Sequence, residues 1–227
     1  VHKPETQRQE NYLSERLRSD EVPTMIYMVR HGETVLTPMR KFSGIGPLNP
    51  ELTEKGLGQA ATVAKEIAKL NPEVIVASPL ARTTQTAQAI SAATGIEITF
   101  DEIWYELSFG DWDGLSFEEV KEKSPDEYQA WLNSSSYAPG GGESYDQAGY
   151  RVEEALEKIA AEYPSQRVVV VTHNGVIKLA AQIVTGAPTE AVFHIDAAPC
   201  SITSISIWPS DGLRALRSPN ETGHFRP

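Results

Sequence analysis

The stretch that decides the fold is MIYMVRHGET, residues 25–34. Its first five residues are apolar and prone to β-structure, which predicts a buried strand over residues 25–29. This strand runs directly into Arg30, His31 and Gly32. Ligands of open α/β sheets bind beyond the carboxyl ends of the strands, so polar residues at this position are candidates for a functional site.

Strands and helices alternate along the chain after this stretch. Short apolar runs predict further strands over residues 74–77, 96–100 and 168–172. Apolar periodicity, capping residues and breakers predict helices over residues 53–70, 80–94, 116–132 (interrupted at Pro125), 144–163 and 174–185. Residues 201–208 and 213–217 are predicted to form paired edge strands around the Asp211–Gly212 turn. The alternation predicts a three-layer α/β/α sandwich with a mostly parallel central sheet.

Composition limits the classes of protein to which the chain can belong. Its 227 residues, of which 40% are hydrophobic, suit one compact domain. The net charge of -11 disfavours binding to nucleic acid or to anionic lipid. No run approaches the roughly 20 apolar residues that span a bilayer. The single cysteine, Cys200, is typical of a reducing cytoplasm. We expect a cytoplasmic monomer or homodimer that acts on a small molecule.

The first residues of the chain differ in composition from the rest. Residues 1–24 start at Val1, not at Met, and are rich in Arg, Glu, Gln and Ser. They predict a polar linker or tail, and residues 25–227 predict the folded domain.

Cationic side chains follow several predicted strands of this acidic protein. Arg30 and His31 follow the first strand, Arg82 lies one helical turn after the second, and His173 follows the strand over residues 168–172. Because the carboxyl ends of parallel strands meet at one edge, we expect these side chains to lie together. Arginine presents a fork of donors that matches phosphate oxygens. The sequence therefore predicts a binding site for a phosphoryl group.

The same residues predict a phosphoryl-transfer reaction. A neutral imidazole is a competent nucleophile, so His31 can attack phosphorus while the cations stabilise the phosphoryl oxygens. Glu106 can protonate the leaving oxygen and then accept a proton from water. The other carboxylates considered for this role are Asp101, Glu102, Asp111 and Asp113.

Four segments resemble, in the right order, the motifs of the histidine phosphatase (phosphoglycerate mutase-like) superfamily. They are RHGET at 30–34, SPLARTTQTA at 78–87, ELSFGDWDG at 106–114 and THNG at 172–175. The resemblance implies that His31 is phosphorylated, that Arg30, Arg82 and His173 hold the phosphoryl group, and that Glu106 donates the proton. It implies a phosphoglycerate mutase-like fold and an acid phosphatase that needs no metal and no cofactor.

Other segments refine the resemblance. RKFSG, residues 40–44, is similar to the first-loop phosphate contact of the family, which implies phosphate-binding roles for Ser43 and Gly44. PGGGES, residues 139–144, resembles the loop at the pocket rim of the small phosphatases. Thr37 stands where many members have Asn, and Asn174 stands where many have Gly. Both are counted as candidate phosphate contacts.

Within the family, the chain looks closest to alpha-ribazole phosphatases and to the phosphatase half of actinobacterial ribonuclease H fusions. The latter resemblance predicts a fused N-terminal ribonuclease H domain in the full-length protein.

Two alternative functions and the role of His194 stay undecided at this point. A cofactor-dependent mutase would use the same phosphohistidine, but the region 116–144 is short and has only Lys121 and Lys123 as cations. A non-catalytic phosphate-binding module would lack the nucleophile or the acid, whereas His31 and Glu106 are both present. His194 can either line the pocket or make a structural hydrogen bond.

Overall fold

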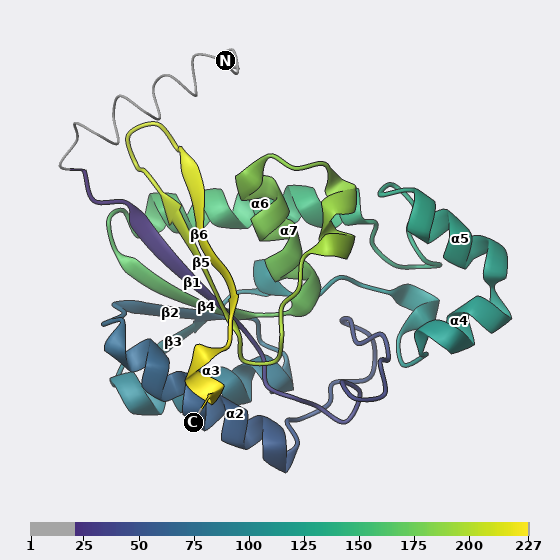
Figure 1. Ribbon diagram of the computed structural model, residues 1–227, viewed down its shortest axis with the longest axis horizontal. Helices are drawn as coiled ribbons and strands as arrows, with labels where there is room; N and C mark the ends of the chain where they lie inside the picture. Colours follow the sequence, from purple (N-terminus) through teal and green to yellow (C-terminus); the bar gives the residue numbers. More distant parts are fainter. Residues whose placement is uncertain (1–20, 227) are drawn as a thin grey trace.

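A six-stranded mixed sheet lies at the centre of the computed structural model, which describes residues 21–226 (Figure 1). The strands are β1 (Thr24–Arg30), β2 (Val74–Ala77), β3 (Ile98–Phe100), β4 (Arg167–Thr172), β5 (Ile202–Ile207) and β6 (Arg214–Glu221), in the order β3-β2-β4-β1-β5-β6. The first four run parallel to one another, and β5 runs antiparallel to both β1 and β6. The predicted mostly parallel sheet is confirmed.

Helices cover both faces of the sheet and one pair extends beyond it (Figure 1). One face carries α2 (Glu54–Lys69) and α3 (Ala81–Thr94), and the other carries α6 (Tyr145–Glu162) and α7 (Asn174–Thr185). The pair α4 (Phe117–Lys123) and α5 (Pro125–Asn133) lies to one side, past the carboxyl ends of the strands. Short 3₁₀ helices are η1 (Glu102–Trp104), η2 (Gly110–Trp112), η3 (Thr189–His194) and η4 (Gly223–Phe225).

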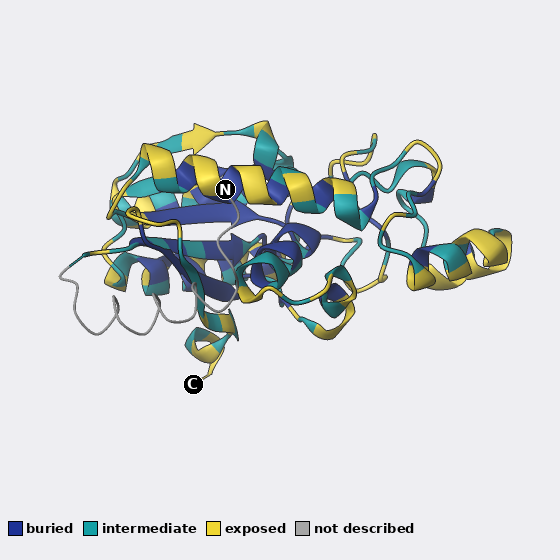
Figure 2. Cartoon of the chain, turned by 90° about the horizontal axis from the view of Figure 1, so that it is seen from above, coloured by how far each residue is buried: buried dark blue, intermediate teal, exposed yellow. Residues whose placement is uncertain are grey.

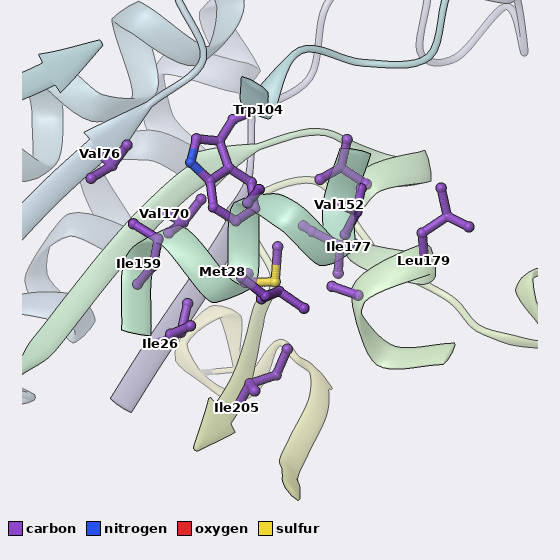
Figure 3. Packing of buried hydrophobic residues seen from close by; sticks show 14 of the residues in the cluster. Ile26, Met28, Val76, Trp104, Val152, Ile159, Val170, Ile177, Leu179 and Ile205 are labelled. Atoms are coloured by element: carbon purple, nitrogen blue, oxygen red, sulfur yellow. The ribbon is translucent and has the colours of Figure 1, made fainter. Parts of the chain in front are cut away.

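The central strands are apolar throughout because helices bury them on both sides. Ile26 and Met28 of β1 pack with α6 and α7, as Figure 3 shows, whereas Val29 points to the side of α2 and α3. In Figure 2 the buried strands lie between helices whose outer faces are exposed. The sheet is therefore the rigid middle layer on which the site is built.

Capping residues set the helix boundaries close to where the sequence predicts them. Thr53 accepts a hydrogen bond from the Gly56 amide, and Ser116 and Ser144 each form a capping box with the residue three positions later. Pro125 is the first residue of α5 and divides the predicted 116–132 helix into two.

The strand predicted over residues 201–208 was wrongly placed at the edge of the sheet. β5 pairs with β1 on one side and with β6 on the other, and all six of its residues are buried. Only β6 of this hairpin is an edge strand. β5 is therefore not available for pairing with a second copy of the chain.

The first strand begins one residue earlier than predicted. β1 starts at Thr24, and the Glu21 carboxylate accepts hydrogen bonds from the amide and hydroxyl of Ser210. Residues 1–20 of the predicted linker lie outside the described residues.

Candidate active site

The two histidines of the predicted site are brought together by adjacent parallel strands. In the register of β1 and β4, Arg30 pairs with Thr172, so His31 and His173 leave the same edge. The His31 amide donates to the Thr172 carbonyl at 3.0 Å. The two imidazole rings meet edge to face, with centroids 5.4 Å apart.

The protonation of His31 follows from its hydrogen bond to the backbone. Its Nδ1 lies 2.7 Å from the Gly32 carbonyl oxygen. A carbonyl can only accept, so Nδ1 carries the proton. Burial, together with the charges of Arg82 and Arg30, holds the pKa of His31 well below its usual value, so the ring is neutral. The Nε2 atom therefore has a free lone pair.

His173 is fixed by Ser78, the first residue of the SPLARTTQTA segment, for which the sequence predicted no role in the site. Its Nε2 lies 2.8 Å from the hydroxyl of Ser78, which follows β2. The ring is fully buried, and burial lowers its pKa well below the usual value. A neutral His173 whose Nε2 accepts from Ser78 carries its proton on Nδ1.

Both arginines bind backbone carbonyls with part of the guanidinium group. Arg30 donates from Nη1 to Ala197, and Arg82 donates from Nη2 to Ser43 and Gly44 at 3.0 and 3.2 Å. Arg82 is 0% exposed, and desolvation lowers its pKa to about 10, which keeps it charged near neutral pH.

Buried donors are left without partners at this edge of the sheet. Four nitrogens have no hydrogen-bond partner among the described residues: Arg30 Nε, Arg82 Nε, Arg82 Nη1 and His173 Nδ1. A buried donor without a partner costs about 1–3 kcal/mol, so such a cluster in a native fold indicates a ligand. Donors of this kind suit an anion.

Glu106 is the carboxyl group that joins this cluster. Its two oxygens accept from the amides of Leu107 and Gly175 at 3.1 and 3.2 Å. A Cβ atom on Gly175 would lie 2.6 Å from Glu106 Oε1, which explains the glycine at that position. Burial raises the pKa of Glu106, although both amides and both arginines oppose the shift.

The other carboxylates considered for the acid are bonded to other groups or are exposed. Asp101 forms an ion pair with Lys158, and Glu102 accepts from the hydroxyl of Tyr105. Asp113 accepts from the Gly44 amide at 2.6 Å. Asp111 is exposed.

The loop at residues 43–44 acts on the site through Arg82. The carbonyls of Ser43 and Gly44 hold the Arg82 guanidinium, whereas the Gly44 amide is already bound to Asp113. A Cβ atom on Gly44 would lie 2.3 Å from the Leu107 carbonyl oxygen, so this loop needs glycine for close packing. The Ser43 hydroxyl is buried and has no partner in the described chain.

The remaining predicted residues differ in their placement. The Thr37 hydroxyl bonds with Thr34 in a local turn, which occupies it within its own loop. Asn174 is half-buried at the start of α7, directly after His173. His194 is exposed, and no hydrogen bond to another part of residues 21–226 is observed for it. A structural hydrogen bond of His194 is thus not seen.

Comparison with known proteins gives the family. The profile described as "Histidine phosphatase superfamily (branch 1)" matches residues 26–220. This chain belongs to the histidine phosphatase superfamily. The predicted resemblance is therefore confirmed. The match covers the sheet from Ile26 in β1 to Asn220 in β6.

Relatives within the histidine phosphatase superfamily include proteins of different length. The chain is 34% identical over 206 residues to the "Bifunctional protein Rv2228c" of Mycobacterium tuberculosis, covering 89% of this chain and 55% of that protein. It thus spans about half the length of that relative. It is 27% identical over 170 residues to the adenosylcobalamin/alpha-ribazole phosphatase of Escherichia coli, covering 74% and 83% of the two chains.

A solved structure of the superfamily shares the fold. The mycobacterial glucosyl-3-phosphoglycerate phosphatase superimposes with a TM-score of 0.79 at 27% identity, over 88% of this chain and all of the other. Within residues 21–226, no helix is both long enough and apolar enough to cross a bilayer.

Proposed function

We propose that this chain hydrolyses phosphomonoesters through a phosphohistidine intermediate on His31, with Glu106 as the proton donor. One observation carries the proposal: a neutral imidazole with a free Nε2 atom lies beside four buried donor nitrogens that lack partners. Superfamily membership and phosphatase relatives support the same reaction class.

In the first step, the phosphoryl group occupies the cluster of unpartnered donors. The His31 Nε2 lone pair forms a bond to phosphorus, and the bond from phosphorus to the ester oxygen breaks. The arginines stabilise the charge on the equatorial oxygens, and His173 donates from Nδ1. Glu106, whose pKa burial raises, gives its proton to the departing oxygen.

In the second step, water replaces the departed alcohol. The Glu106 carboxylate takes a proton from this water, and the water oxygen attacks phosphorus. The bond between phosphorus and His31 Nε2 breaks, inorganic phosphate leaves, and Glu106 is again protonated. The groups that bind the phosphoryl oxygens and transfer the proton in this cycle are all side chains of this chain, so the proposed reaction uses no metal and no cofactor.

The proposal includes the wider setting of the domain. The phosphatase domain occupies residues 25–227, works in the cytoplasm as a monomer or homodimer, and in the full-length protein follows a ribonuclease H domain across the polar segment 1–24. The polar composition of that segment and the greater length of the mycobacterial relative support this arrangement.

The direct test is phosphate release from a panel of phosphomonoesters in excess chelator. The panel contains an aryl phosphate, alpha-ribazole phosphate, 3-phosphoglycerate, sugar phosphates and nucleotides. Wild type is expected to release phosphate, and His31→Ala is expected to abolish release. His194→Ala is the matched control, because His194 is exposed.

Each alternative function has its own outcome in this test. Isomerisation of 3-phosphoglycerate in the presence of a bisphosphate, without hydrolysis, would establish the mutase. Binding of phosphate without any turnover would establish the binding module. Release that survives His31→Ala would contradict the phosphohistidine mechanism.

A further inference from the structure

The helix that follows His173 carries a lysine that the proposed reaction does not use. α7 begins at Asn174, and its first turn touches the site because the Gly175 amide donates to Glu106. Lys178 lies four residues after Asn174, and both are half-buried among buried neighbours. Residues four apart share one face of a helix, so Asn174 and Lys178 form a single stripe.

The stripe leads from the site toward the molecular surface. In an α-helix each Cα–Cβ bond tilts toward the N-terminus, so the Lys178 side chain extends back over Asn174. That end of α7 is where Glu106 and His173 lie. The ammonium group is therefore directed to the side of the site on which the proton donor lies.

Among the lysines of residues 21–226, Lys178 is the half-buried one without an ion pair, whereas the other lysines without an ion pair, Lys65, Lys121 and Lys123, are exposed. Lys41, Lys55, Lys69 and Lys158 each pair with a carboxylate within 4 Å. Lys178 is half-buried and makes no hydrogen bond or ion pair within residues 21–226. A partly desolvated ammonium group without a partner is unfavourable, and an anion would relieve that cost.

The charges around Lys178 agree with this placement. Burial has the largest influence on the pKa of Lys178 and lowers it. The negative charges of Asp196 and Glu106 raise this pKa, and the positive charge of Arg30 lowers it. It thus shares the electrostatic environment of the site without belonging to the cluster that holds the phosphoryl group. Asp196 lies in the segment that follows η3. In the same segment, the carbonyl of Ala197 accepts a hydrogen bond from Arg30.

The proton donor defines where the leaving group lies. Glu106 must reach the ester oxygen, so the alcohol part of the substrate extends past Glu106. We propose that Lys178 binds a second anionic group on that alcohol, so that the preferred substrates are small phosphomonoesters that also carry a carboxylate or a second phosphate. This inference rests on the proposed function and narrows it to a substrate class.

The test compares two substrates that differ in the second anion. We would measure kcat/KM for 3-phosphoglycerate and for phenyl phosphate with wild type, Lys178→Met, Lys178→Arg and the control Lys65→Met. Lys65 is an exposed lysine of α2. Because a hydrogen bond to a charged group is lost, Lys178→Met should lower the ratio of kcat/KM for 3-phosphoglycerate to kcat/KM for phenyl phosphate by roughly 10- to 100-fold. Lys178→Arg should restore most of the ratio, and Lys65→Met should leave it intact.

An unchanged ratio in Lys178→Met would overturn the inference, even if the variant loses thermal stability. That combination would show that Lys178 has a structural role only.

A binding measurement separates this inference from the proposed function. Calorimetry would compare 3-phosphoglycerate with inorganic phosphate in the His31→Ala background, with and without Lys178→Met. A selective loss of 3-phosphoglycerate affinity supports the lysine contact even if no ester is hydrolysed, in which case the proposed hydrolysis fails instead. Equal affinity with and without Lys178 contradicts the inference whether or not the wild type is a phosphatase.

Discussion

Two regions use buried side chains in opposite ways. One is the edge of the sheet around His31, and the other is the α4–α5 excursion, the helix pair that extends past the sheet. At the sheet edge, four donor nitrogens are buried without partners. In the excursion, aromatic rings fill the interior, and Trp131 contacts Phe42 and Trp112 with ring centroids 5.8 Å apart in both cases. The first arrangement costs stability and leaves donors available to a ligand, whereas the second provides stability.

Trp131 also connects the excursion to the rest of the molecule. Its ring lies 5.7 Å from Tyr145, the first residue of α6, and 5.5 Å from Phe193 of η3. The comparison therefore predicts that substitutions in the two regions separate activity from stability.

The largest expected effect is the loss of activity in Arg82→Met. This change removes two of the unpartnered donors, and one such donor is worth about 10²- to 10³-fold in rate, so kcat/KM should fall at least about a thousandfold. The change also leaves the Ser43 and Gly44 carbonyls without their donor, so we expect a modest fall in melting temperature that leaves the protein folded at the assay temperature. Kinetics and thermal unfolding of the same preparation check both parts. A stability loss that accounts for the inactivity would contradict the contrast.

Trp131→Ala should show the reverse pattern. Removing a buried tryptophan typically costs 3–5 kcal/mol, and we expect about 3 kcal/mol because α5 lies at the periphery. Specific activity well below the melting temperature should persist, since the ring partners of Trp131 are other aromatic residues and none of them belongs to the donor cluster. Denaturant unfolding checks the loss, with Leu132→Ala as the control, because Leu132 is 37% exposed.

Glu106→Gln should produce a smaller effect that depends on the leaving group. General acid catalysis contributes roughly 10²-fold or more, so alkyl phosphates should slow by about that factor, and aryl phosphates with good leaving groups should slow less. Burial raises the pKa of Glu106, so its proton is present below that pKa and lost as pH rises through it. The wild-type kcat/KM for alkyl esters should therefore fall on the alkaline side, and Glu106→Gln should lack that limb. An identical pH profile in the variant would assign the proton to another group.

Much of the sheet edge could be predicted because its residues adjoin regular elements. Arg30 and His31 follow an apolar strand, and His173 follows another, so the parallel pairing of β1 and β4 is enough to bring them together. Helix starts at Ser116 and Ser144 followed from local capping patterns.

The missed features depend on contacts between distant segments. Nothing near Gly44 indicates that its amide binds Asp113, which is 69 residues away. The Ser78 hydroxyl bonds to His173 across 95 residues. β5 reads as an edge strand from sequence, and only its pairing with β1 shows that it lies inside the sheet. Periodicity describes one element at a time and cannot specify such pairings.

The central claim is that the phosphoryl group passes through His31, and a rapid-quench trapping experiment tests it most directly. Wild type would be mixed with an aryl phosphate, quenched under alkaline conditions that preserve phosphohistidine, and digested for mass spectrometry. We predict one phosphoryl group on the peptide that contains His31, formed before steady-state turnover and absent from His31→Ala. Turnover with a phosphoryl group on another residue, or with no trapped phosphoryl group at any quench time, would contradict the account.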